Sequence, residues 1–109
     1  MPIYTIDLSC RAAGHDYTPL FTALRQADAV PFMDARWLLD VREDLGGVTE
    51  ALLRHCAPGD RLFVTELAPE TRWSGTGLRE DVKAWILARM ARGADEEAAI
   101  GGETPRRGP

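Results

Sequence analysis

The spacing of hydrophobic positions predicts a strand at the start of the chain. Residues 3–8, IYTIDL, are rich in β-formers and alternate between two faces. The alternation places Tyr4, Ile6 and Leu8 on one face of this strand and Asp7 on the other. An acidic side chain therefore lies near the end of the first strand, away from the side that carries its largest apolar residues.

The rest of the chain switches between the strand period and the helical period. Further strands are predicted at 29–34, 36–42 and 61–67. A first helix is predicted from a Thr18 cap, with Pro19 at the first helical position, to about residue 28. A second helix is predicted to begin after an Asp44 cap and to end before Pro58, and a third helix to span 77–92.

The predicted order is β-α-β-β-α-β followed by one more helix. The simplest fold with this order is an α+β ferredoxin-like βαββαβ sandwich with an additional C-terminal helix, in which two helices cover one face of an antiparallel sheet. Pro31 cannot donate to a strand ladder, so the second strand belongs at a sheet edge. We expect residues 1–92 to form this domain and residues 93–109 to be a disordered tail.

In that fold the first and third strands are central, and Asp7 points to the face that the two main helices leave uncovered. This face is not wholly polar, because Ile3 shares it and the fourth strand has apolar residues of both parities. The apolar residues of the fourth strand are Leu62 and Val64 on one face or Phe63 and Leu67 on the other. The third helix or a second copy of the chain is therefore expected to cover part of it.

Composition adds a constraint on partners. The chain has 109 residues, of which 17 are acidic and 13 basic, so its formal net charge is -4. This balance disfavours tight, non-specific binding to a phosphate backbone. Nearly all the basic residues are arginine, the better phosphate ligand, so a local patch remains an alternative to a plain solvated surface. The candidate nucleic-acid-binding residues are Arg11, Arg36, Arg42 and Arg72.

The cysteines and the lack of a long apolar run bear on location. Cys10 and Cys56 lie far apart and form no C-x-x-C pair, and the chain begins directly in a strand pattern. No apolar run approaches the roughly 20 residues that span a membrane. We therefore expect a cytoplasmic protein with free thiols and no membrane partner. Cys10 with His15 could form a nucleophile and base, although incidental proximity is the simpler interpretation.

Five segments together resemble a known group of small bacterial proteins. They are IYTIDL, DYTPLFTAL, MDARWLLDV, GDRLFVTEL and the closing WSG…VKAWI. The resemblance covers residues 3–90 and is to the SinR-like small bacterial proteins, which are distinct from the helix-turn-helix sporulation regulator. These in turn resemble the CRISPR-associated protein two family and, more distantly, virulence-associated protein D.

The resemblance implies a ferredoxin-like homodimer, associated in some members with metal-dependent nuclease activity. An Asp at the end of the first strand of each subunit is the signature of the CRISPR group, and Asp7 matches that position. Asp7 thereby becomes the candidate catalytic residue and the candidate ligand for Mg²⁺. The alternative interpretation is that Asp7 accepts backbone N–H bonds from the following loop, 9–14.

Three functions follow as hypotheses. The first is a metal-dependent endonuclease or nucleic-acid-associated homodimer, for which Trp73 could supply a stacking surface. The second is a non-enzymatic module that binds a partner protein. The third is a small-molecule or anion sensor at the glycine-containing loop 74–80, where a helix begins.

Overall fold

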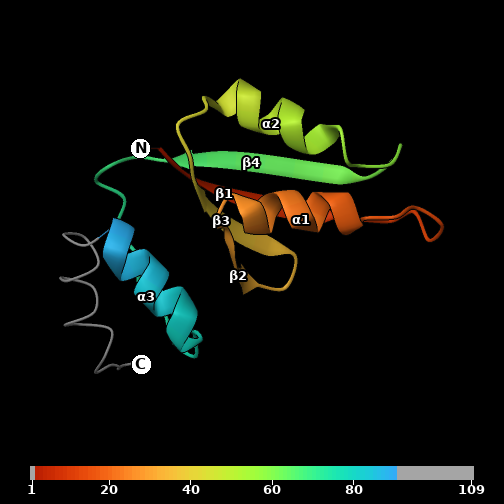
Figure 1. Cartoon of the computed structure of the whole chain (residues 1–109). Helices are drawn as coiled ribbons and strands as arrows, with labels where there is room; N and C mark the ends of the chain where they lie inside the picture. The colour runs from red at the N-terminus through yellow and green to blue at the C-terminus, as the bar shows by residue number, and fades with distance from the viewer. Residues whose placement is uncertain (1, 91–109) are drawn as a thin grey trace. The chain divides into compact units, whose positions relative to one another are not determined.

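The computed structural model describes residues 2–90, so the predicted disorder of 93–109 lies outside the described residues. The chain divides into two compact units, a first unit Met1–Leu67 and a second unit Ala68–Pro109. The helices and strands, drawn in Figure 1, are β1 (Ile3–Ser9), α1 (Thr18–Gln26), β2 (Val30–Met33), β3 (Arg36–Asp40), α2 (Leu45–Leu53), β4 (Arg61–Leu67) and α3 (Glu80–Arg89).

The predicted order of helices and strands is confirmed, and the boundaries of β1 to β4 agree within two residues. The least accurate predictions are two helix ends, because α2 ends at Leu53, well before Pro58, and α3 begins at Glu80 rather than at residue 77. Gly77 has a φ angle of 75°, a left-handed conformation that a helix does not contain. The chain therefore turns before it enters α3.

The four strands form one antiparallel sheet in the order β2-β3-β1-β4. β1 and β3 are central, as predicted, and β2 lies at an edge, where Pro31 needs no ladder partner for its missing N–H. The first unit is thus a small α+β structure in which every pair of neighbouring strands is antiparallel.

The core of the first unit lies between one face of the sheet and the helices α1 and α2, which run along the sheet in Figure 1. The alternation of β1 supplies one side of this core, since Tyr4 and Ile6 are fully buried. The other buried members of the core are Leu8, Leu20, Leu24, Ala29, Trp37, Leu39, Val48 and Leu52. The buried Tyr4 hydroxyl donates to the backbone oxygen of Glu43 at 2.6 Å, so its polar end is satisfied.

The two predicted helix caps have different outcomes. Asp44 caps α2 as predicted, because its Oδ1 accepts the Gly47 N–H at 2.8 Å. The Thr18 cap is wrong: Thr18 is the first residue of α1, and the side chain of Asp16 accepts its N–H at 3.0 Å. Pro19 still lies in the first turn, where its missing N–H costs nothing.

The hairpin between β2 and β3 turns at Asp34 and Ala35, where the sequence pattern breaks. Ala35 has a φ of 61°, a left-handed conformation that an alanine adopts only at a cost. Its carbonyl oxygen accepts the Leu8 N–H at 2.9 Å, so the turn is attached to the end of β1. This contact fixes the hairpin beside the part of β1 that carries Asp7.

The second unit contains α3, whose buried side chains are Val82, Trp85 and Ile86. These three residues share one helical face, as their spacing predicts. The Arg89 guanidinium lies 4.2 Å from the centre of the Trp85 ring. Among residues 2–90, no helix is long and apolar enough to cross a membrane.

Candidate functional site

The sheet has a second face, opposite to the one that α1 and α2 cover. The strand register defines its members, since residues that pair directly share a face. They are Ile3, Thr5, Asp7 and Ser9 of β1, Val30 and Met33 of β2, Arg36, Leu38 and Asp40 of β3, and Arg61, Phe63, Thr65 and Leu67 of β4. Asp7 therefore lies on the face predicted for it.

Asp7 forms an ion pair with Arg36 on this face. The two residues are directly opposite in the β1–β3 register, and Arg36 Nε donates to Asp7 Oδ1 at 2.5 Å. The Asp7 side chain is 29% exposed and the Arg36 side chain 55% exposed. A pair this open to solvent contributes little stability. The ion pair bears on metal binding, because the Arg36 guanidinium occupies one of the two Asp7 oxygens that a metal cation would need as ligands.

Four residues form a row that crosses the whole sheet, here called the cross-sheet row. Met33 pairs with Arg36, Arg36 with Asp7, and Asp7 with Phe63, so one residue comes from each strand. Phe63 is 66% exposed and Met33 is 54% exposed. The row thus presents an ion pair flanked on both sides by a large exposed apolar side chain.

The register separates the candidate arginines. Arg36 lies beside Asp7, and Arg11 follows the end of β1 near which Asp7 lies. Arg42 follows β3 at the opposite end of the sheet, because Asp40 pairs with Ile3.

The fourth candidate, Arg72, is an exposed residue of the second unit. The sequence interpretation missed Arg61, which pairs with Ser9 and so lies at the same end of the sheet as Asp7. Its position two residues before Phe63 in a predicted strand was the available signal.

A second polar cluster joins the loop after β1 to the turn before β4, with Asp60 at its centre. Asp60 Oδ1 accepts the Arg11 N–H at 2.8 Å, and Oδ2 accepts the Ala57 N–H at 2.7 Å. The Tyr17 hydroxyl donates to the same carboxylate at 2.7 and 2.8 Å. The backbone N–H of Arg11, followed by those of Ala57 and the Tyr17 hydroxyl, lowers the pKa of Asp60.

The same cluster bears on the hypothesis that Cys10 and His15 act as nucleophile and base. His15 Nε2 lies 3.0 Å from the backbone oxygen of His55, and its ring packs edge-on against Tyr17. Burial, followed by the charge of Asp60 and by Cys56, raises the pKa of the Cys10 thiol. A catalytic thiol needs the opposite shift. The surroundings of Cys10 therefore do not activate it as a nucleophile.

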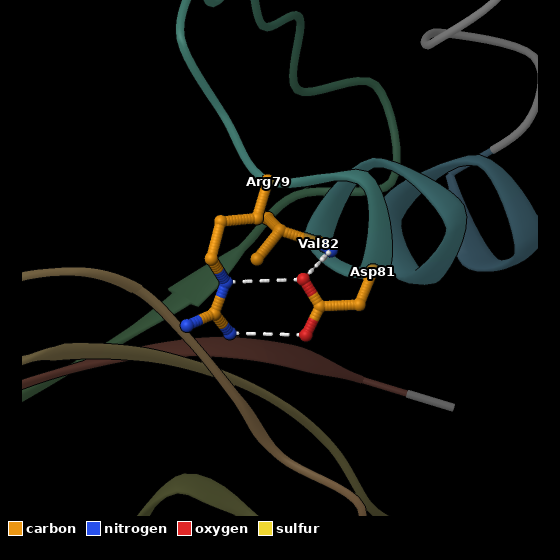
Figure 2. Close-up of polar contacts among 3 residues, drawn as sticks. All are labelled: Arg79, Asp81 and Val82. Atoms are coloured by element: carbon orange, nitrogen blue, oxygen red, sulfur yellow. Dashed lines mark hydrogen bonds and ion pairs between the residues drawn. The ribbon is translucent and has the colours of Figure 1, made fainter.

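The start of α3, where an anion site was hypothesised, carries the chain's own carboxylates. Figure 2 shows the Arg79 guanidinium bonded to both oxygens of Asp81, at 3.1 and 3.0 Å. Asp81 Oδ1 also accepts the Val82 N–H at 2.9 Å. The Arg79 hydrogen bonds are the main cause of a lowered pKa for Asp81. With Glu80 in the same turn, the N-terminus of α3 already faces negative charge, which disfavours an external anion.

Two of the three tryptophans are core residues, and the third is partly accessible. Trp37 is buried in the first unit, where its ring stacks near Phe21 with the centroids 6.0 Å apart, and Trp85 is buried in α3. Trp73 is half-buried, so part of its surface is accessible. Trp37 and Trp85 are structural residues, and Trp73 is the one that reaches solvent appreciably.

Residues 2–90 contain no group of three or more His, Cys, Asp or Glu side chains placed to hold a metal ion. Comparisons of this chain with protein-family models, with curated proteins and with solved structures find no match. The cross-sheet row, which combines an ion pair with two exposed apolar side chains, is therefore the candidate functional site of residues 2–90.

Proposed function

We propose that the first unit is a ferredoxin-like module that pairs with a second copy of the chain through the second face of its sheet. The fold part of this proposal is supported by the order β-α-β-β-α-β, by the central position of β1 and β3, and by helices α1 and α2 on one face. The homodimer is also what the resemblance to the SinR-like and CRISPR-associated proteins implies.

The observation that carries the proposal is the self-complementary order of the cross-sheet row. A two-fold axis that lies in the interface plane, parallel to the strands and above the point midway between Arg36 and Asp7, turns the second copy face to face with the first and reverses the row. Each Asp7 then faces the Arg36 of the other copy, and each Phe63 faces the Met33 of the other copy. Opposite charges and apolar groups are matched by one operation, as an isologous interface requires.

The apolar ends of the row supply the driving force in this proposal. Phe63 and Met33 are more than half exposed in the single chain, although full burial of such side chains is worth about 1.5–3 kcal/mol each. A dimer buries two copies of both residues. The Asp7–Arg36 pairs would then fix the register of the two copies more than they add affinity.

A matched pair of substitutions tests the dimer. Phe63→Arg places a charge at the apolar end of the row, and we expect it to weaken the dimer at least tenfold, corresponding to about 1.4 kcal/mol. Leu53→Arg is the control, because Leu53 is 52% exposed but lies on α2. Light scattering measures the mass of each variant, and circular dichroism verifies the fold. A wild-type dimer that Phe63→Arg leaves intact would exclude this interface.

The second candidate function is a metal-dependent endonuclease, which the position of the partly exposed Asp7 on the proposed interface favours. Within one chain the described residues do not fit Mg²⁺, because Arg36 occupies one Asp7 oxygen and no further carboxylate joins it. The nuclease hypothesis therefore requires the Asp7 of a second copy. If the protein is not a nuclease, the same dimer is a non-enzymatic interaction module.

The nuclease is tested with Asp7→Asn, which keeps the size of the side chain and removes its charge. We expect the wild type to cut RNA or DNA in the presence of Mg²⁺ or Mn²⁺ and Asp7→Asn to lose that activity. Asp34→Asn, in the exposed β2–β3 turn, is the control for a loss of acidic charge. Equal cutting by wild type and Asp7→Asn would exclude Asp7 as the catalytic residue, and no cutting by wild type would leave the interaction module as the function.

A further inference from the structure

The two cysteines approach each other at the Asp60 cluster, although they are far apart in the sequence. Cys10 directly precedes Arg11, and Cys56 directly precedes Ala57. The N–H groups of Arg11 and Ala57 bond to the two oxygens of the one Asp60 carboxylate, at 2.8 and 2.7 Å. Each cysteine Cα is only about 2.4 Å from the nitrogen of the next residue. One side chain therefore holds both cysteine backbones close to it.

The direction of the strands agrees with this approach. Ser9 pairs with Arg61 at the end of the β1–β4 ladder, so Cys10 and Asp60 occupy the next positions along the two chains. Cys10 follows Leu8 by two positions, and Leu8 points to the side of the sheet where α2 lies. Cys56 packs partly against the same core. Cys56 therefore lies on the helix side of the sheet, and alternation continued one residue past the end of β1 places Cys10 on the same side, where the two thiols interact electrostatically.

The two thiols differ in their access to solvent. Cys10 is exposed, and Cys56 is half-buried, with its Sγ donating to the backbone oxygen of Leu52 at 3.5 Å. An exposed thiol reacts first with an oxidant from solution, and a sheltered neighbour then resolves the product. Neither residue is part of the cross-sheet row, so this chemistry is independent of the proposed dimer.

We propose that Cys10 and Cys56 form a reversible intramolecular disulfide when the protein meets a small disulfide oxidant such as glutathione disulfide. The Cys10 thiolate attacks one sulfur of the oxidant, and the first glutathione leaves as a thiolate that takes up a proton. The Cys56 thiolate then attacks the Cys10 sulfur and releases the second glutathione. Two protein S–H bonds are lost, one S–S bond forms, and the oxidant is reduced to two thiols.

The disulfide would lock the loop after β1 to the turn before β4, which Asp60 now joins by hydrogen bonds alone. The cross-link closes a long loop, so it constrains the unfolded chain and stabilises the folded one. Burial and the charge of Asp60 raise the pKa of both thiols. Both thiols are therefore mostly protonated at neutral pH. As long as the pH stays below the thiol pKa, each increase of one pH unit should raise the reaction rate about tenfold.

The experiment uses the full chain at low micromolar concentration with glutathione disulfide at pH 8.5. Mass spectrometry should show a loss of about 2 Da and a cross-linked pair of peptides containing Cys10 and Cys56, both reversed by a reducing agent. The oxidised protein should unfold at a temperature about 5 °C or more above that of the reduced protein.

Two variants separate the steps. Cys56→Ser should accumulate a stable mixed disulfide between Cys10 and glutathione, and Cys10→Ser should react more slowly because its remaining thiol is sheltered. A wild-type protein that yields only mixed disulfides with glutathione, or only disulfide-linked dimers, would overturn the proposal. The measurement on the wild type does not depend on the folding of either variant.

Discussion

Asp60 shows how a single residue can link distant parts of this chain. Its carboxylate accepts hydrogen bonds from Arg11, Ala57 and Tyr17, and these bonds favour the charged form. The folded pKa of Asp60 is therefore below its unfolded value of about 4. The stability that this difference supplies is complete above about pH 4 and is lost as the pH falls through the folded pKa.

Replacing Asp60 with Asn should lower the free energy of unfolding at pH 7. An amide presents one oxygen acceptor, so it cannot accept the N–H groups of Arg11 and Ala57 on both sides. Urea unfolding at several pH values measures the effect, with Asp34→Asn as the control. We expect the difference in free energy of unfolding between wild type and Asp60→Asn to become smaller as the pH falls toward about 2. A gap independent of pH would show that the charge of Asp60 is not the cause.

Local sequence patterns could predict the sheet face on which Asp7 lies, but they could not predict the role of Asp60. The face of Asp7 follows from alternation within one strand, which needs no knowledge of the fold. Asp60 carried only the signal of a turn residue after Pro58 and Gly59. Its partners Arg11 and Tyr17 come from a loop more than forty residues earlier in the chain. No sequence spacing predicts that Asp60 contacts Arg11 and Tyr17.

At the scale of the helices and strands, prediction was accurate for the bounds of the strands and less accurate for the ends of the helices. β4 was predicted at 61–67 and spans Arg61–Leu67. The caps were harder, because short polar residues compete for the same N–H groups. At the start of α2, the Asp44 side chain accepts the Gly47 N–H as predicted. At the start of α1, the side chain of Asp16 accepts the Thr18 N–H, and the helix begins one residue earlier than predicted.

The cap of α2 can be tested by removing its acceptor. Asp44→Ala leaves the Gly47 N–H without a side-chain partner and should lower the free energy of unfolding by about 1 kcal/mol. Asp44→Asn keeps an oxygen at the same place and should remain close to wild type. Urea unfolding of both variants provides the comparison. If Asn destabilises as much as Ala, the cap bond is not what Asp44 contributes.

At the scale of the whole molecule, the cross-sheet row depends on the register of three strand pairs. The sequence indicates that Asp7 and Phe63 are in strands, yet it does not say that they are directly opposite one another. The β2–β3 register also shifts between Pro31 and Met33, which brings Met33 opposite Arg36. A bulge of this kind has no reliable sequence signal. The self-complementary surface could therefore be recognised only from the folded chain.

The most direct test of the proposed dimer is the mass of the full-length wild-type protein in solution. Sedimentation equilibrium over a series of concentrations from about 1 to 100 μM covers the affinities expected for an interface with a few apolar anchors. The proposal predicts a mass that rises toward about 24 kDa, twice the 12.0 kDa of one chain. A mass that stays at 12.0 kDa across the series would contradict it.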